Sequence, residues 1–151
     1  MANETGSAAP RPPIHLWVVG ILALLWNAIG VTDYVMMRTR NEEYFRSVMP
    51  DLNVGAALAY MDSMPLWASI GWALGVWGAV AGTLLLFARS RHSVVVLMVS
   101  LIGALISFAH QFAGPTPPAG MDDPVVPIIV TGIAVALLLY ARWMTARGVL
   151  R

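Results

Sequence analysis

The sequence predicts an all-α fold: an integral membrane four-helix bundle with a short helical loop on the periplasmic side. Composition is the first reason, because only 11% of the residues are charged, whereas a soluble domain carries roughly 25%. The second is that four stretches contain no Asp, Glu, Lys or Arg, namely residues 14–32, 64–88, 92–121 and 125–141. Since backbone polar groups in lipid must be satisfied within the segment, such runs are expected to form helices.

The bounds of the helices follow from the length that a bilayer requires, about 20 mostly apolar residues. The third stretch ends near Phe112, because glycine and prolines follow it. Four membrane-spanning helices are predicted over about 13–37, 65–88, 92–112 and 125–144, within a single domain of residues 13–145. Residues 1–12 are expected to form a disordered cytoplasmic tail, and residues 146–151 a cytoplasmic C-terminal tail.

The arginines predict the orientation, because cytoplasmic loops carry an excess of basic residues. Six arginines lie on the side of the termini and three on the other side. The first group is Arg11, Arg89, Arg91, Arg142, Arg147 and Arg151, and the second is Arg38, Arg40 and Arg46. We therefore expect a bacterial inner-membrane protein with both termini in the cytoplasm.

The loop from Arg38 to Asp62 is the longest connection between two spans. Its first part, "NEEYFRSVM", can continue the first helix, with Glu42 and Arg46 spaced for an i, i+4 ion pair. A second short helix is expected after Pro50, with Asp51 as its N-cap. The loop therefore predicts a helical cap.

Glycines on the second span form a stripe, because Gly71, Gly75, Gly78 and Gly82 fall within about 60° on the helical wheel. Small residues at this spacing allow another helix to approach closely. Packing within the chain is the favoured interpretation, and a seam between copies of the chain is the alternative.

Two polar residues interrupt the first span. Asn27 lies roughly 16 Å from the end of the helix at Arg38, near mid-membrane, and Asp33 lies only about 7 Å from it. Asn27 shares a face with Gly20 and Tyr34 and is expected to form a hydrogen bond across helices.

Asp33 points about 120° away from the face that carries Asn27, with Gly30 between them as a further helix-packing position. A carboxylate within a span indicates function by default. The alternative is a hydrated or arginine-paired structural carboxylate, and His110 is a further candidate partner.

The third span carries serines seven residues apart, at positions 93, 100 and 107, with Gln111 on the same stripe and His110 beside it. This stripe either lines a cavity or packs closely with its serines bonded to their own i−4 carbonyls. The candidate solute site comprises Asn27, Asp33, Tyr34, Ser107, His110 and Gln111.

The sequence lacks the residues that several classes of function require. Without cysteine there is no thiol redox chemistry, disulfide or thiolate metal site. The motifs of zinc proteases, P-loop nucleotide-binding proteins and serine hydrolases are missing, and a net charge of +1 does not favour nucleic acid. The sequence predicts no enzyme, no cofactor and no metal site. The expected partner is the lipid bilayer, and a homo-oligomer or a partner membrane protein stays open.

The segments "LALLWNAIGVTDYVMMRTRNEEYF" and "PLWASIGWALGVWGAVAGTLLLFARSRHSVVVLMVSLIG" resemble a group of small bacterial four-helix inner-membrane proteins. These are mostly uncharacterised and are sometimes labelled sugar transporter. The resemblance runs from about Leu22 to Leu105, and the W-N-x-x-G-x-x-D-Y motif carries most of it. It implies small-solute, sugar-like transport. The alternative is an accessory or assembly subunit that binds another membrane protein.

Overall fold

The computed structural model describes residues 12–151, which contain six helices and no strand. The helices are α1 (Ile14–Arg38), α2 (Glu42–Val48), α3 (Val54–Asp62), α4 (Leu66–Phe87), α5 (His92–Ala113) and α6 (Val125–Ala146). The four long ones, α1, α4, α5 and α6, are long and apolar enough to cross a membrane. The predicted all-α four-helix bundle is therefore confirmed, and each span ends within two residues of its predicted bounds. The predicted N-terminal tail lies outside the described residues except for Pro12.

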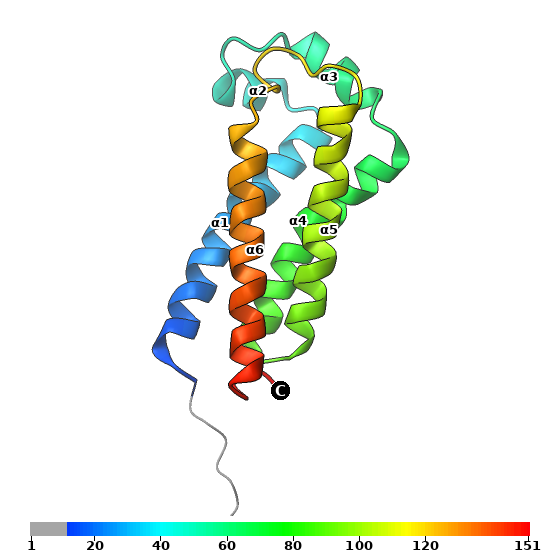
Figure 1. The fold of residues 1–151 in the computed structure, drawn as a ribbon. Coiled ribbons are helices and arrows are strands. Elements are labelled where there is room, and N and C mark those ends of the chain that lie inside the picture. Colours follow the sequence, from blue (N-terminus) through cyan, green and yellow to red (C-terminus); the bar gives the residue numbers. More distant parts are fainter. Residues whose placement is uncertain (1–11) are drawn as a thin grey trace, which may run out of the picture.

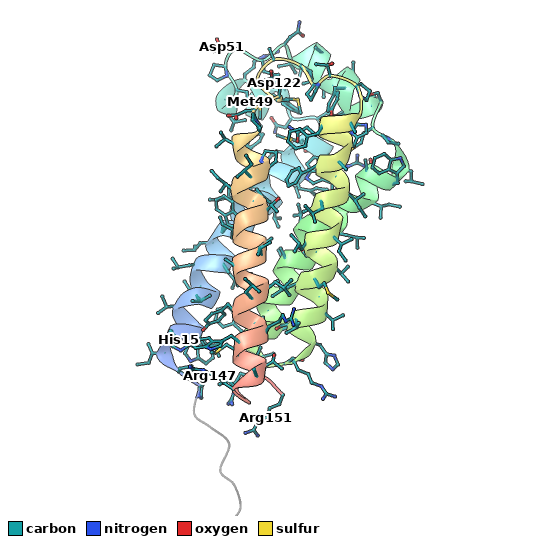
Figure 2. All side chains as sticks on the ribbon, in the orientation of Figure 1. His15, Met49, Asp51, Asp122, Arg147 and Arg151 are labelled. Atoms are coloured by element: carbon teal, nitrogen blue, oxygen red, sulfur yellow. The ribbon has the colours of Figure 1, made fainter. Side chains whose placement is uncertain are left out.

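The four long helices run side by side, and both short helices gather at one end of the bundle (Figure 1). The loop between α5 and α6 covers the same end, while the C-terminus lies at the other end near the start of α1 (Figure 1). Figure 2 shows His15, Arg147 and Arg151 at the second end and Met49, Asp51 and Asp122 at the first. We call residues 39–65 together with residues 114–124 the helical cap.

The glycine stripe of α4 packs against α5. A Cβ atom added at Gly75 would lie 3.1 Å from the backbone nitrogen of Ala104, and one at Gly78 would lie 2.9 Å from the Cβ of Ser100. The hydroxyl of Ser100 donates to the carbonyl of Gly75 at 2.6 Å, so it bonds across the helices and not to its own i−4 carbonyl. The stripe therefore serves packing within the chain, which leaves this face no room for a helix of another chain.

Helix α1 lies against α4 through the face predicted from the helical wheel. A Cβ added at Gly20 would come within 2.7 Å of the Phe87 ring, and the Tyr34 and Trp72 rings meet edge to face with centroids 4.8 Å apart. Gly30 does not take part, since a Cβ there would meet no atom within 4 Å. Gly30 lies outside the face that α4 covers, so its predicted packing role is not filled by a helix among residues 12–151 and stays a prediction.

The segment that follows α6 is fixed against the α4–α5 turn. Val149 and Leu150 are buried in the main core. The Arg91 amide donates to the Arg151 carbonyl at 2.9 Å, and the Arg151 amide donates to the Arg89 carbonyl at 2.8 Å. The last residues therefore close the bundle, where a tail was expected.

The cap is built differently from its prediction. Helix α1 does not continue into "NEEYFRSVM", because the chain turns at Arg40, whose φ is +57°, and α2 starts anew after its N-cap Asn41. The N-cap of α3 is Asn53, which accepts from the Ala56 amide at 3.0 Å, and not Asp51. The predicted ion pair between Glu42 and Arg46 is present at 2.8 Å.

Candidate functional site

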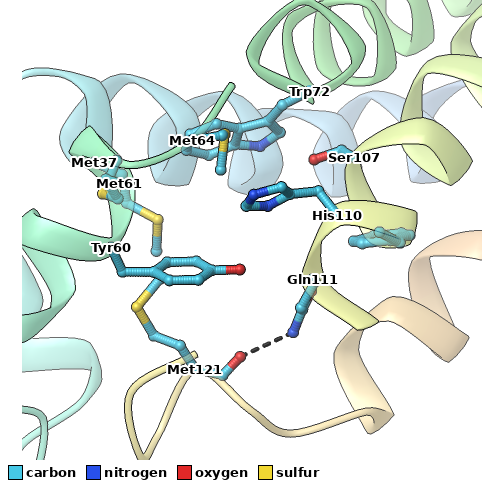
Figure 3. A pocket seen from close by; sticks show the side chains of 10 residues that line it. Met37, Tyr60, Met61, Met64, Trp72, Ser107, His110, Gln111 and Met121 are labelled. Atoms are coloured by element: carbon cyan, nitrogen blue, oxygen red, sulfur yellow. Dashed lines mark hydrogen bonds between the residues drawn. The ribbon is translucent and has the colours of Figure 1, made fainter. Parts of the chain in front are cut away.

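A cavity of about 140 Å³ lies beneath the cap, between the end of α1, α3, α4, α5 and the loop before α6. Side chains of three kinds line most of it (Figure 3). The polar ones are Ser107, His110 and Gln111, the aromatic ones include Tyr60 and Trp72, and the methionines are Met37, Met61, Met64 and Met121. A concave apolar site with a few converging polar groups is the usual form of a small-molecule site, and the volume of this one is below the usual range of about 300–1,000 Å³.

The polar wall belongs to α5, and it holds three of the six predicted site residues. Gln111 donates from its amide to the carbonyl of Met121 at 2.8 Å, which fastens the loop over the cavity (Figure 3). His110 is only 4% exposed, and its ring lies 5.8 Å from the Tyr60 ring and 5.7 Å from the Trp67 ring, between centroids. The polar end of the serine stripe thus faces a cavity, as one of the two interpretations of that stripe predicted.

Tyr60 contributes a hydroxyl that sequence reasoning missed. Its oxygen is buried and has no hydrogen-bond partner among residues 12–151. Figure 3 shows this hydroxyl pointing toward the space between His110 and Gln111. Burial raises the pKa of the Tyr60 phenol, so the group stays protonated at neutral pH and can donate a hydrogen bond to an occupant.

The methionines come from four separate segments. Met37 lies in the last turn of α1, Met61 belongs to α3, Met64 precedes α4, and Met121 lies in the loop before α6. Their positions in the chain give no periodic pattern, so only the fold brings their thioethers together.

Asn27 lies away from the cavity and joins α1 to α4. It is 8% exposed, and its amide donates to the carbonyl of Ala79 at 3.1 Å and to the hydroxyl of Thr83 at 3.0 Å. The predicted hydrogen bond across helices is confirmed. Its role in the structure is helix packing.

Asp33 also lies away from the cavity, and it accepts a hydrogen bond from the Tyr44 hydroxyl of α2. Burial, then the hydrogen bond and the charge of Asp33, raises the pKa of Tyr44 to about 12, so the phenol remains a donor at neutral pH. The expected pairing of Asp33 with His110 is not found, because the His110 ring lies against Tyr60 and Trp67 instead. Asp33 therefore holds the cap to α1.

No Asp, Glu, Lys or Arg lines the cavity. Within the part of the chain that the structure describes, no group of three or more His, Asp or Glu side chains comes together. The donors are hydroxyl, imidazole, amide and thioether. Such a set can bind a small solute through hydrogen bonds and apolar contacts.

No protein-family model, curated protein or solved structure matches the chain.

Proposed function

We propose that this multi-pass membrane protein is a component of small-solute transport and that it holds its solute in the cavity beneath the cap. The observation that carries the proposal is the convergence of Ser107, His110, Gln111 and the unpartnered Tyr60 hydroxyl on one cavity. A buried hydroxyl without a partner is costly unless something else bonds to it. A solute at this place supplies that bond. The proposal assigns no catalytic residue.

The proposed orientation places the cap in the periplasm of a bacterial inner membrane and both termini in the cytoplasm. The end that carries the C-terminus holds five of the described arginines, and the cap end holds the other three. An excess of arginine marks the cytoplasmic side. In this orientation the cavity lies where a solute arrives from outside the cell.

The lining favours a compact solute with few polar groups. A sugar-like solute, which the sequence resemblance implies, carries a hydroxyl on nearly every carbon, and each needs a partner when it leaves water. Only a few polar side chains line the cavity, and the Gln111 amide already bonds to Met121. A sugar is therefore the weaker candidate within this proposal.

An accessory subunit could bind its partner through the glycine stripe of α4 or through the cap. Because α5 fills the glycine stripe, only the cap remains for this alternative. A transport role still calls for more than one bundle, since known secondary transporters combine repeated helical units. We therefore expect the protein to act with a second copy or with another membrane protein. Purification in mild detergent followed by mass measurement tests this expectation, and a lone monomer would contradict it.

The solute site itself is tested by thermal unfolding of the purified protein with a panel of probes: glucose, a small alcohol, imidazole and monovalent metal salts. A bound probe raises the unfolding temperature by mass action. Ser107→Leu fills the cavity and should abolish the shift, while Ser47→Leu, the same change at an exposed position of α2, should keep it. A shift that is equal in both variants, or the lack of any shift in the wild-type protein, would overturn the proposal.

Uptake into liposomes then separates binding from transport. The probe that stabilises the protein should enter vesicles that contain the wild-type protein faster than vesicles that contain Ser107→Leu. Equal rates in both would remove the transport role and leave a binding protein.

A further inference from the structure

The methionines of this chain are concentrated at the cap. Eight lie in the part of the chain that the structure describes, and six of these belong to the cap or to the helix ends that it covers. The six are Met36, Met37, Met49, Met61, Met64 and Met121. The remaining apolar surface of the spans is mostly leucine, isoleucine and valine. An apolar lining could be made from the same aliphatic residues, so the thioethers at the cavity are a chemical feature to be explained.

The imidazole of His110 lines the same cavity as these thioethers. His110 is almost fully buried and points into the cavity, and no hydrogen bond joins its ring to another residue in the range 12–151 (Figure 3). A metal-binding histidine needs a free ring nitrogen with an unshared pair, and this ring has no protein partner competing for it. The site therefore offers sulfur and nitrogen donors together.

The donor set selects the class of ion. Thioether sulfur is a soft ligand that favours Cu(I), while Ca²⁺ and Mg²⁺ require carboxylate and carbonyl oxygens. No carboxylate lines the cavity. A wall without carboxylates also favours a single positive charge over a double one, because the cost of taking an ion out of water rises steeply with its charge. These points favour a soft monovalent ion.

The cavity can adapt to such an ion. Methionine has three rotatable bonds and fills irregular space, so the sulfurs of Met61, Met64 and Met121 can draw in around an occupant smaller than 140 Å³. Trp72 forms part of the wall and presents a ring that attracts cations. The unpartnered Tyr60 hydroxyl beside these groups is consistent with a site whose occupant completes it.

We propose that the cap cavity binds Cu(I), or its analogue Ag(I), through the thioethers of Met61, Met64 and Met121 and the imidazole of His110. Met37 is a further donor at the same wall. The inference rests on the proposed function only in taking the cavity as the solute site, and it names the solute class. Binding forms bonds from sulfur and nitrogen lone pairs to the ion, and neither metal nor protein changes its oxidation state.

Flexible core packing is the competing role for these methionines, and leucine distinguishes the two. Met→Leu keeps apolar volume and costs little in a core, but it removes the sulfur. We would titrate the purified full-length protein with silver nitrate in chloride-free buffer. Tryptophan fluorescence and the silver retained after desalting would be measured.

The wild-type protein should retain one Ag(I) per chain beyond any bound at exposed side chains. Loss of an outer partner of a metal ligand already weakens binding about 10–100-fold, so Met61→Leu/Met64→Leu/Met121→Leu should weaken it at least about ten-fold. His110→Phe, which keeps a ring between Tyr60 and Trp67, should also weaken it. The control Met98→Leu removes a methionine that is 45% exposed on α5 and should leave the affinity unchanged.

Equal silver binding by the triple leucine variant and the wild-type protein would overturn the inference, provided that both show the same helical circular dichroism. If an organic probe raises the unfolding temperature and Ag(I) does not bind, the cavity remains the solute site and the metal assignment fails. If Ag(I) binds through these residues but does not cross liposomes, the metal assignment stands and the transport role fails.

Discussion

The α4–α5 contact makes the sharpest structural prediction, which concerns one added methyl group on α5. Gly103→Ala would place a Cβ 2.7 Å from the carbonyl oxygen of Gly71 and 2.8 Å from the amide nitrogen of Gly75. An ordinary contact of a Cβ atom with such atoms is 3.4–4 Å. Both neighbours are backbone atoms and cannot rotate aside, so the helices must separate by roughly an ångström.

The magnitude follows from opposing contributions. Overpacking costs about 1–3 kcal/mol, and separation stretches the Ser100 hydrogen bond to α4, a kind of bond worth about 0.6 kcal/mol on average in a membrane. Alanine in place of glycine returns about 0.8–1.0 kcal/mol of helix propensity. We therefore expect Gly103→Ala to lower the free energy of unfolding by about 1–2 kcal/mol.

Gly132→Ala is the matched control, because a Cβ at this α6 position would meet no atom within 4 Å. It keeps the propensity gain without the clash, so unfolding should be unchanged or shifted upward by up to about 1 kcal/mol. The assay is equilibrium unfolding of each variant in mixed detergent, followed by helical circular dichroism. If Gly103→Ala proved as stable as Gly132→Ala, the close α4–α5 contact described here would be refuted.

Three further predictions concern the remaining contacts. Asn27→Ala should lower the free energy of unfolding by about 1 kcal/mol. A double-mutant cycle with Thr83→Val should show a favourable coupling energy, because the two side chains share a hydrogen bond. Additive effects of the two substitutions would show that this contact is absent. Tyr44→Phe should raise the rate of proteolysis within the cap. Adding Asp33→Asn should raise this rate little further, since Tyr44→Phe already removes the hydrogen bond between the two residues. A large further increase in the rate would contradict this prediction. Leu150→Ala should lower the free energy of unfolding by about 2 kcal/mol or more, the usual cost of truncating a buried leucine. If residues 149–151 formed a free tail, the substitution would have no effect in the same unfolding assay.

The membrane-spanning helices could be predicted from the sequence because each is encoded by a local pattern of residues. Charge-free runs of the right length predict helices, and the helical wheel of α1 places Gly20, Asn27 and Tyr34 on the face that meets α4. The α4 glycine stripe likewise predicted a close neighbour, although the sequence could not decide that α5 was that neighbour. The sequence could not show that Gly30 lies outside the contact with α4, because residue spacing alone does not reveal which side of a helix is covered.

The cap was harder to predict, because short helices depend on single residues. Both Asp51 and Asn53 are good N-caps, and only the turn geometry selects Asn53. Arg40 reverses the chain with a positive φ, which few residues other than glycine adopt, so the sequence gives no sign of that turn. Val149 and Leu150 carry no periodic signal that would indicate burial.

The candidate site was predicted in part. Ser107, His110 and Gln111 share one helix, so their stripe was visible in the sequence, and the structure places them at one cavity. Tyr60 and the methionines come from other segments and meet these residues only through the fold. Methionine also counts as an ordinary apolar residue in any hydropathy pattern, so its clustering had no signal before the cap was assembled.

In the proposed site the occupant lies beneath the cap, among thioethers and an imidazole. Crystals grown with Ag(I) test it most directly, because anomalous scattering locates silver without assumptions about its ligands. We expect one strong peak within the cavity, next to the sulfurs of Met61 and Met64 and the ring of His110. Silver found only at exposed positions such as Met98 or His92, with the cap cavity empty, would contradict it.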